Sequence, residues 1–150
     1  MTTVRAYRKQ QLVEKPRRAR FVREAPHVAG DLVVLLELPL RTRTEGNNNE
    51  FWRARQKRAR HARGITKVSL RARRRADDLK LPLNVLLTRI APRLLDEVDN
   101  VSSSLKHVRD GVADWLGIDD KASSPINWHY HQEQQTKTYA VRIEIFEAER

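Results

Sequence analysis

The chain of 150 residues is long enough for one compact domain, and it contains no cysteine, which excludes disulfides and thiolate-bound zinc. Its 30 Lys and Arg residues outnumber 19 Asp and Glu residues, and the resulting net charge of +11 favours a polyanionic partner, nucleic acid before an anionic membrane. No apolar run is as long as a membrane span and the Arg-rich N-terminus lacks the apolar block of a secretory signal, so we expect a soluble cytoplasmic protein.

The charge is divided unevenly along the sequence. Positions 1–28 hold eight basic and two acidic residues, and positions 41–80 hold fourteen basic and four acidic residues. Positions 81–150 hold eight basic against eleven acidic residues. We therefore predict a basic N-terminal arm over residues 1–28 and one folded domain over residues 29–150, with phosphate binding and acid-based chemistry assigned to different segments.

The hydrophobic pattern predicts six elements in the order β-α-β-α-β-β. The two segments Leu32–Leu38 and Leu83–Ile90 are apolar runs short enough for buried strands. A basic helix is expected from Phe51 to Arg63, ending at Gly64, and a second basic helix over Thr66–Asp78. Apolar residues at helical spacing predict an amphipathic helix over residues 100–116 that stops at Gly117, and alternating patterns predict strands around Ile126–Tyr130 and Tyr139–Ile145. This order indicates an α/β or α+β fold, a single small domain with a mixed β-sheet flanked by helices.

Two acidic groups flank the helix predicted over residues 100–116, one before it (Asp96, Glu97 and Asp99) and one after it (Asp119 and Asp120). On a helical wheel, Lys106 and Asp110 fall within about 20° of Asp99 on the side away from the apolar stripe. If these carboxylates converge at about 5 Å, each pair repels by roughly 3 kcal/mol at an effective dielectric of 20, and a divalent cation removes that cost. Magnesium, which prefers carboxylate oxygens, is the expected ion, and it can promote attack on a phosphodiester. The structural alternative is that the first group stabilises the helix dipole and the second group forms a turn.

The same segment resembles the motif of the RusA family of Holliday-junction resolvases. In that family an acid-x-Asp-Asn segment opens a helix that carries a Lys and then an Asp, and an Asp-Asp pair follows. Here Asp99-Asn100, Lys106, Asp110 and Asp119-Asp120 match these positions. For the first acid the strict spacing selects Glu97, whereas the Leu-Asp context selects Asp96, and Lys106 lies further from Asp99 than in the best-known member.

The resemblance implies a dimeric endonuclease, of a kind frequent in phages and prophages, that cuts four-way DNA junctions in the bacterial or phage-host cytoplasm. It implies Mg²⁺ as the cofactor, with Mn²⁺ as an alternative, held by Asp99 and Asp120 together with Glu97 or Asp96 and supported by Asp119. It assigns Lys106 to stabilising the phosphate transition state, beside Asp99 and Asp120 as catalytic residues. Upstream, residues 47–53 look like the family's Asn-then-aromatic segment, so the resemblance covers roughly residues 31–146.

The basic segment between residues 53 and 74 is the predicted DNA-binding surface. Its cations are too dense to point one way on a helix, so several must face solvent as phosphate contacts, and the candidates are Arg53, Arg55, Lys57, Arg58, Arg60, Arg63, Lys67, Arg71, Arg73 and Arg74. No pattern indicates reading of base edges, which suits a protein that recognises branched DNA by shape. Two other functions remain open, a non-catalytic DNA- or RNA-binding module and an interaction subunit whose basic arm docks on an acidic protein.

Overall fold

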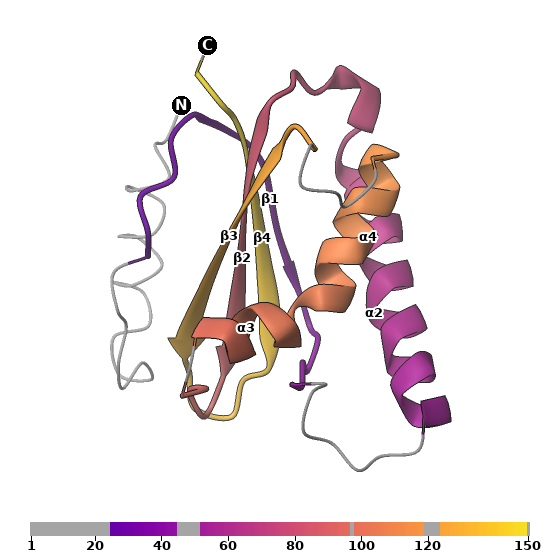
Figure 1. Cartoon of the computed structure of the whole chain (residues 1–150), viewed down its shortest axis with the longest axis vertical. Coiled ribbons are helices and arrows are strands. Elements are labelled where there is room, and N and C mark those ends of the chain that lie inside the picture. The colour runs from indigo at the N-terminus through magenta and orange to yellow at the C-terminus, as the bar shows by residue number, and fades with distance from the viewer. Residues whose placement is uncertain (1–24, 45–51, 97, 119–123, 150) are drawn as a thin grey trace.

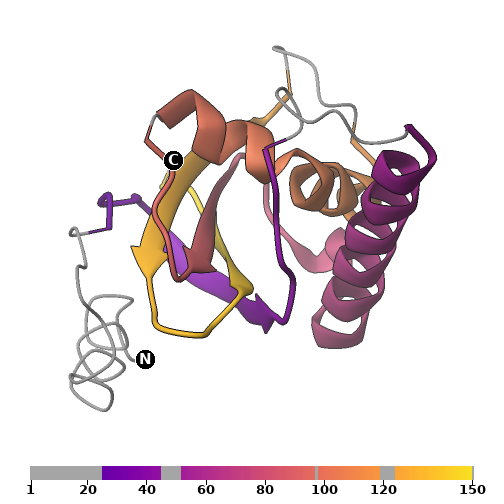
Figure 2. The same cartoon turned by 90° about the horizontal axis from the view of Figure 1, so that it is seen from below.

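The computed structural model describes residues 25–44, 52–96, 98–118 and 124–149, and for Val98 and Asp99 it gives the backbone alone. Four strands form one mixed sheet, with helices packed on one of its faces (Figures 1 and 2). The elements in chain order are β1 (Asp31–Leu38), α2 (Trp52–Arg73), the short 3₁₀ helix η1 (Ala76–Asp78), β2 (Leu83–Ala91), α3 (Val98–Ser104), α4 (Lys106–Leu116), β3 (Ile126–Gln134) and β4 (Ala140–Glu147). The α+β class and the mixed sheet predicted from the sequence are therefore confirmed.

The strand order in the sheet is β1-β4-β2-β3. β4 runs antiparallel to both of its neighbours, whereas β2 and β3 are parallel, with Leu83 opposite Ile126 and Ala91 opposite Gln134. A parallel pair needs a crossover connection, and α3 and α4 supply it. The beginning of β3 consequently lies beside the beginning of β2. It is therefore far from Asp96, which follows the end of β2.

The hydrophobic core lies between the sheet and the helices. Alternate strand residues point to this face, which is why Leu83, Val85 and Leu87 of β2 join Val141, Ile143 and Ile145 of β4 in one buried cluster. Val108 and Val112 of α4 and Leu70 of α2 complete the cluster from the helix side. The predicted amphipathic pattern in residues 100–116 therefore does face the core.

The opposite face of the sheet carries buried charges. Arg142 of β4 forms an ion pair with Glu133 of β3 at 2.5 Å, and its Nε lies 3.6 Å from a carboxylate oxygen of Glu37 in β1. Burial acts to lower the pKa of Arg142, but the attraction and the hydrogen bond of Glu133, together with the charges of Glu37 and Glu144, outweigh it and the pKa is raised. Three strands are thus joined through one guanidinium.

The two basic helices predicted on either side of Gly64 are one continuous helix, so that prediction was wrong. Gly64 lies inside α2 with helical geometry, and a Cβ added there would meet nothing within 4 Å. A glycine inside a helix costs only about 1 kcal/mol relative to alanine. Burial of Thr66 and Leu70, two and six residues further on, offsets that cost and carries the helix past Gly64 to Arg73.

The helix predicted over residues 100–116 is interrupted at Leu105, which separates α3 from α4. The Leu105 amide donates to the Ser102 carbonyl at 3.2 Å, a bond that tightens the last turn of α3, and the Ser104 hydroxyl donates to the Val101 carbonyl at 2.7 Å. Serine hydroxyls that bond to backbone carbonyls compete with the helical ladder. α4 ends as predicted at Gly117, whose φ of 67° closes the helix.

The remaining predictions concern the chain ends and membranes. Of the predicted basic arm, residues 1–24 lie outside the described part, and residues 25–28 have no regular secondary structure. The side-chain amide of Asn84 donates to the Ala29 carbonyl at 2.9 Å, which ties the start of the domain to β2. None of the helices in the described ranges has the length and apolar character needed to cross a membrane.

Candidate nucleic-acid interface and acidic segment

One side of α2 presents a row of cations. At 3.6 residues per turn, five of its basic residues fall within about 80° of one another: Arg53, Lys57, Arg60, Lys67 and Arg71. We call these five residues the basic stripe. Lys67 is half-buried and the other four are exposed. The stripe runs about 27 Å along the helix, and its centre lies about 120° around the helix from Thr66 and Leu70, the residues that α2 buries.

Gly64 lies in the middle of the basic stripe. Because it has no side chain and nothing lies within 4 Å of its Cβ position, the helix backbone is open to solvent between Arg60 and Lys67. A phosphate backbone can approach the helix more closely here than at any residue with a side chain. The residue that sequence reasoning took for a helix end is thus a gap in the middle of the cationic face.

The charge distribution of α2 works against the helix itself. No Asp or Glu occurs among its 22 residues, and its first two and a half turns contain no buried residue. Arg53 and Arg55 in the first turn oppose the helix dipole, at a cost of about 0.3–1 kcal/mol each. Only Arg71 and Arg73 in the last turn complement the dipole. An anionic partner along this helix would relieve the repulsion among its cations. The packing of α2 on the rest of the chain does not require so many cations.

The other predicted DNA contacts divide into packed and exposed positions. Arg63 is held by Asp114 of α4 in a bidentate pair, and Arg74 donates to the Val33 carbonyl at 3.2 Å, so both serve the fold. Arg55 and Arg58 lie on the packed side of α2 and are half-buried. Arg73, at the end of the helix, is exposed. The sequence could not separate these residues from the basic stripe, because the direction of the buried side was unknown.

The first acidic group follows β2 and leads into α3. Asp96 is exposed, Glu97 lies outside the described residues, and the backbone of Asp99 lies in the first turn of α3. Lys106 is the exposed first residue of α4, one turn before Asp110. The interruption at Leu105 places the backbone of Asp99 on a different helix from Lys106 and Asp110, so one helical wheel does not describe all three residues.

The connection between β2 and the acidic group is fixed by side chains that the sequence analysis did not single out. The Gln132 side chain of β3 accepts from the Leu95 amide at 2.8 Å and donates to the Leu95 carbonyl at 2.9 Å. Gln134 donates to the Pro92 carbonyl, also at 2.9 Å, and Arg89 does the same to the Arg93 carbonyl. Asp96 is therefore attached to an anchored segment, as a residue that must hold a ligand in place should be.

The second acidic group, Asp119 and Asp120, lies outside the described residues. Its described neighbours are Ile118 and Ser124. The end of α4 lies beside the end of α2, where Trp115 Nε1 donates to the Arg74 carbonyl at 3.2 Å, and the Pro125 carbonyl accepts from the amide of Leu83, the first residue of β2. Both neighbours therefore lie where β2 begins, whereas Asp96 follows its end, and a nine-residue strand spans about 27 Å.

The described carboxylates do not make a metal site by themselves. No group of three or more His, Asp or Glu side chains suited to a metal ion occurs within residues 25–44, 52–96, 98–118 and 124–149. Asp96 is the one member of the expected ligand set whose side chain is described. The assignment of Mg²⁺ to Asp99 and Asp120 with Glu97 or Asp96, supported by Asp119, stays a prediction.

Comparison with known proteins does not assign the chain to a family. No protein-family model matches it, and no curated protein matches it significantly.

Proposed function

We propose that this chain binds nucleic acid along the basic stripe of α2 and acts as a Mg²⁺-dependent endonuclease on branched DNA, as its resemblance to the RusA family implies. The observation that carries the proposal is the row of five cations, four of them exposed, on a helix that contains no acid. Such a row costs the isolated protein stability and becomes favourable only beside a polyanion. DNA contacts by α2 are the first part of the proposal, and cleavage is the second.

The proposed binding is directed at phosphates. Arg53, Lys57, Arg60 and Arg71 are long, exposed side chains on one face of a helix about 33 Å long, and they can follow a backbone without reading its bases. Recognition then depends on DNA shape, which suits a branched substrate whose arms run in different directions. A homodimer, which the family resemblance implies, would offer two such helices to two arms.

The proposed cleavage depends on the acidic segment after β2. Asp96 and Asp99 follow an anchored connection, and Lys106 begins the next helix. When bound, Mg²⁺ would supply charge neutralisation at the attacked phosphate. Asp99 and Asp120, together with Glu97 or Asp96, would hold it with support from Asp119, and Lys106 would stabilise charge on the phosphate oxygens.

Binding by the basic stripe is tested by the salt dependence of affinity for a DNA duplex without divalent metal. Each of Arg53→Gln, Arg60→Gln and Arg71→Gln should lower the slope of log affinity against log salt by about 0.9, because each variant releases one fewer counterion. The matched control is Lys80→Gln, which removes one exposed charge outside α2. Unchanged slopes in all three stripe variants would overturn the binding proposal.

Cleavage is tested by a magnesium titration on a synthetic four-way junction and on a linear duplex of the same sequence. Wild-type protein should cut the junction selectively. Asp99→Asn should abolish cutting but bind the junction in Ca²⁺ as the wild type does, since it alters the ion site and leaves the stripe intact. Full cleavage by Asp99→Asn would show the assignment of this residue to be wrong.

A non-catalytic nucleic-acid-binding module is the second candidate, and one observation favours it. Ile118 and Ser124, the described neighbours of Asp119 and Asp120, lie at the opposite end of β2 from Asp96, which does not favour one ion shared within a single chain. This candidate predicts binding that depends on the basic stripe, with no cleavage in Mg²⁺ or Mn²⁺ at any concentration.

A further inference from the structure

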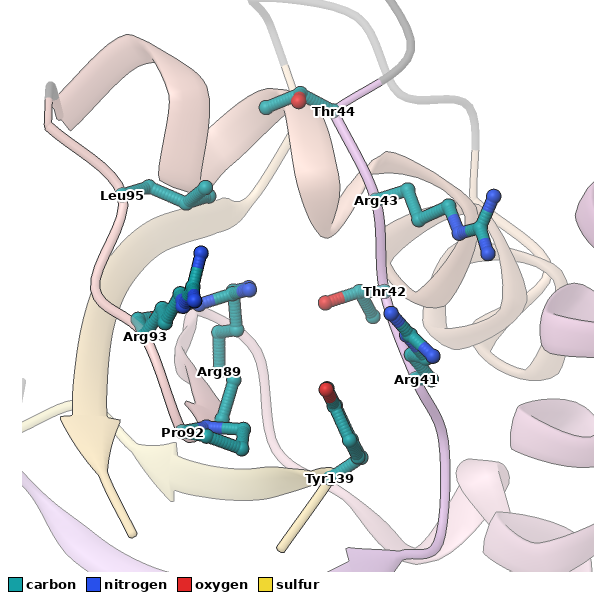
Figure 3. A pocket seen from close by; sticks show the side chains of 10 residues that line it. Arg41, Thr42, Arg43, Thr44, Arg89, Pro92, Arg93, Leu95 and Tyr139 are labelled. Atoms are coloured by element: carbon teal, nitrogen blue, oxygen red, sulfur yellow. The ribbon is translucent and has the colours of Figure 1, made fainter. Parts of the chain in front are cut away.

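A pocket of about 360 Å³ lies at the end of the sheet where β2 ends and β4 begins. Three separate segments line it, the residues after β1, the end of β2 with the connection that follows, and Tyr139 just before β4 (Figure 3). Four of its lining residues are arginines and no described lining residue is acidic; the arginines are Arg41, Arg43, Arg89 and Arg93. The pocket is therefore cationic and has no carboxylate of its own to neutralise it.

Arg89 is the buried member of this group. It is only 8% exposed, and its Nη1 donates to the Arg93 carbonyl at 2.9 Å. Its Nε is buried and has no hydrogen-bond partner among the residues that the structure describes. Burial lowers the pKa of Arg89, and Tyr139 only partly opposes this effect. A guanidinium kept in such a place without a carboxylate is costly to the fold unless an anion binds there.

Two hydroxyl groups face the same space. In Figure 3 the Thr42 and Tyr139 hydroxyls point toward the cavity from the side opposite Arg89. The Tyr139 ring is held by the Arg41 guanidinium, which lies 4.5 Å from the ring centre. Hydroxyls and a guanidinium that converge from three segments are the donor set that a phosphate oxygen prefers.

We propose that this pocket binds a phosphate group of nucleic acid, with Arg89 as its cationic base and the Thr42 and Tyr139 hydroxyls as further donors. The inference rests on the proposed nucleic-acid binding and adds to it a site away from α2. Leu95 lines the pocket and Asp96 follows it directly, so a phosphate held here lies next to the segment proposed to cut DNA. The pocket volume exceeds that of one phosphate, which leaves room for the adjoining sugar.

The site can be tested with inorganic phosphate and with a duplex oligonucleotide that lacks terminal phosphates, both without divalent metal. The readout is the Nε–H signal of Arg89 in a ¹⁵N-correlated NMR spectrum at constant ionic strength. Phosphate should shift this signal saturably, and the duplex should shift it in the same direction. Thr42→Val and Tyr139→Phe should each weaken phosphate binding several-fold. Tyr139→Phe keeps the ring beneath Arg41, so it removes only the hydroxyl.

Arg89→Met removes the cationic base, and Lys80→Met is its control, since it removes an exposed charge at the other end of β2. Phosphate should raise the melting temperature of the wild type and of Lys80→Met but not that of Arg89→Met. If Arg89→Met does not fold, Thr42→Val and Tyr139→Phe decide the question. The inference is overturned if phosphate or chloride shifts the Nε–H signals of the stripe arginines and of Arg89 alike. It is also overturned if duplex DNA binds without shifting the Arg89 signal. Phosphate binding at Arg89 in a protein that binds no DNA would uphold the pocket and refute the proposed function.

Discussion

Arg63 of α2 and Asp114 of α4 form a bidentate ion pair, in which Nε and Nη2 of the arginine each donate to one carboxylate oxygen, with Nη2 2.7 Å from Oδ1. The pair joins the two helices. The hydrogen bond from Arg63 lowers the pKa of Asp114, against a smaller opposing effect of burial, and the pKa of Arg63 is raised in return. The helix that carries the basic stripe is thus joined to α4 by a cation whose charge is already paired with a carboxylate.

Replacement of this carboxylate should make stability less dependent on pH. Because the pKa of Asp114 is lower in the folded protein than in the unfolded chain, its stabilising effect is complete above the ordinary pKa of about 4 and disappears as the pH falls through the folded value. Asp114→Asn should lower the free energy of unfolding by about 0.5–1 kcal/mol at neutral pH, the range of a partly exposed pair. Urea unfolding from pH 7 to pH 2 should show the two proteins converging in acid. The exposed Asp77→Asn serves as control, and a difference from wild type that persists at pH 2 would contradict the prediction.

Replacement by alanine should have opposite effects on the free energy of unfolding at two glycines, one on each of the packed helices. A Cβ on Gly111 of α4 would lie 2.7 Å from the Arg63 carbonyl oxygen and 2.7 Å from Thr66 Cβ, so α2 would have to move. Gly111→Ala should lower the free energy of unfolding by about 1–3 kcal/mol. Gly64→Ala meets nothing and should raise it by about 0.5–1 kcal/mol, because alanine loses less backbone entropy in a helix. Thermal and urea unfolding of both variants measure the contrast, and a stabilising Gly111→Ala would refute the close packing.

Loss of the Glu133 carboxylate, which pairs with Arg142, should lower the free energy of unfolding far more than loss of the Glu37 carboxylate. Glu133 and Arg142 are both buried, so Glu133→Gln leaves a buried cation without its closest counterion and should cost about 3 kcal/mol. Glu37 is 44% exposed and 3.6 Å from the same guanidinium, so Glu37→Gln should cost less than about 1 kcal/mol. Urea unfolding at pH 7 compares them directly. Equal losses would mean that the two carboxylates contribute alike.

The positions of the residues beside the two acidic groups lead to a distinct prediction for a dimer. Because Ile118 and Ser124 lie at the opposite end of β2 from Asp96, we expect that Asp99 and Asp120, if they meet on one ion, come from different copies of the chain. Asp99→Asn and Asp120→Asn should then each be inactive, whereas an equal mixture, unfolded and refolded together, should regain about a quarter of the wild-type nicking rate, since half of the dimers hold one intact site. Nicking of a junction-bearing plasmid in Mg²⁺ is the measurement. An inactive mixture, with mixed dimers confirmed by differential tagging, would exclude a shared ion of this kind.

The sequence by itself determined the class of fold and the distribution of charge. Hydrophobic alternation and helical spacing are local properties, and for this reason the strand starts at Leu83 and Ile126 and the helix end at Gly117 were predicted within one or two residues. The surplus of cations in residues 41–80 likewise needs no structure to be seen. The interruption at Leu105 and the continuity through Gly64 were missed, because burial of Thr66 and Leu70 and the bonds of Ser102 and Ser104 decide them.

Only the tertiary structure decided which side chains, distant in the sequence, lie close together. The direction of the buried side of α2 separates the basic stripe from Arg63 and Arg74, and sequence spacing alone carries no such direction. Thr42, Arg89 and Tyr139 are far apart in the chain and meet because β1, β2 and β4 belong to one sheet. The parallel pairing of β2 with β3 places the neighbours of Asp119 and Asp120 away from Asp96, although the two acidic groups flank a single stretch of sequence. Periodicity records which side of an element is buried, whereas the meeting of distant residues depends on strand order, which no local pattern specifies.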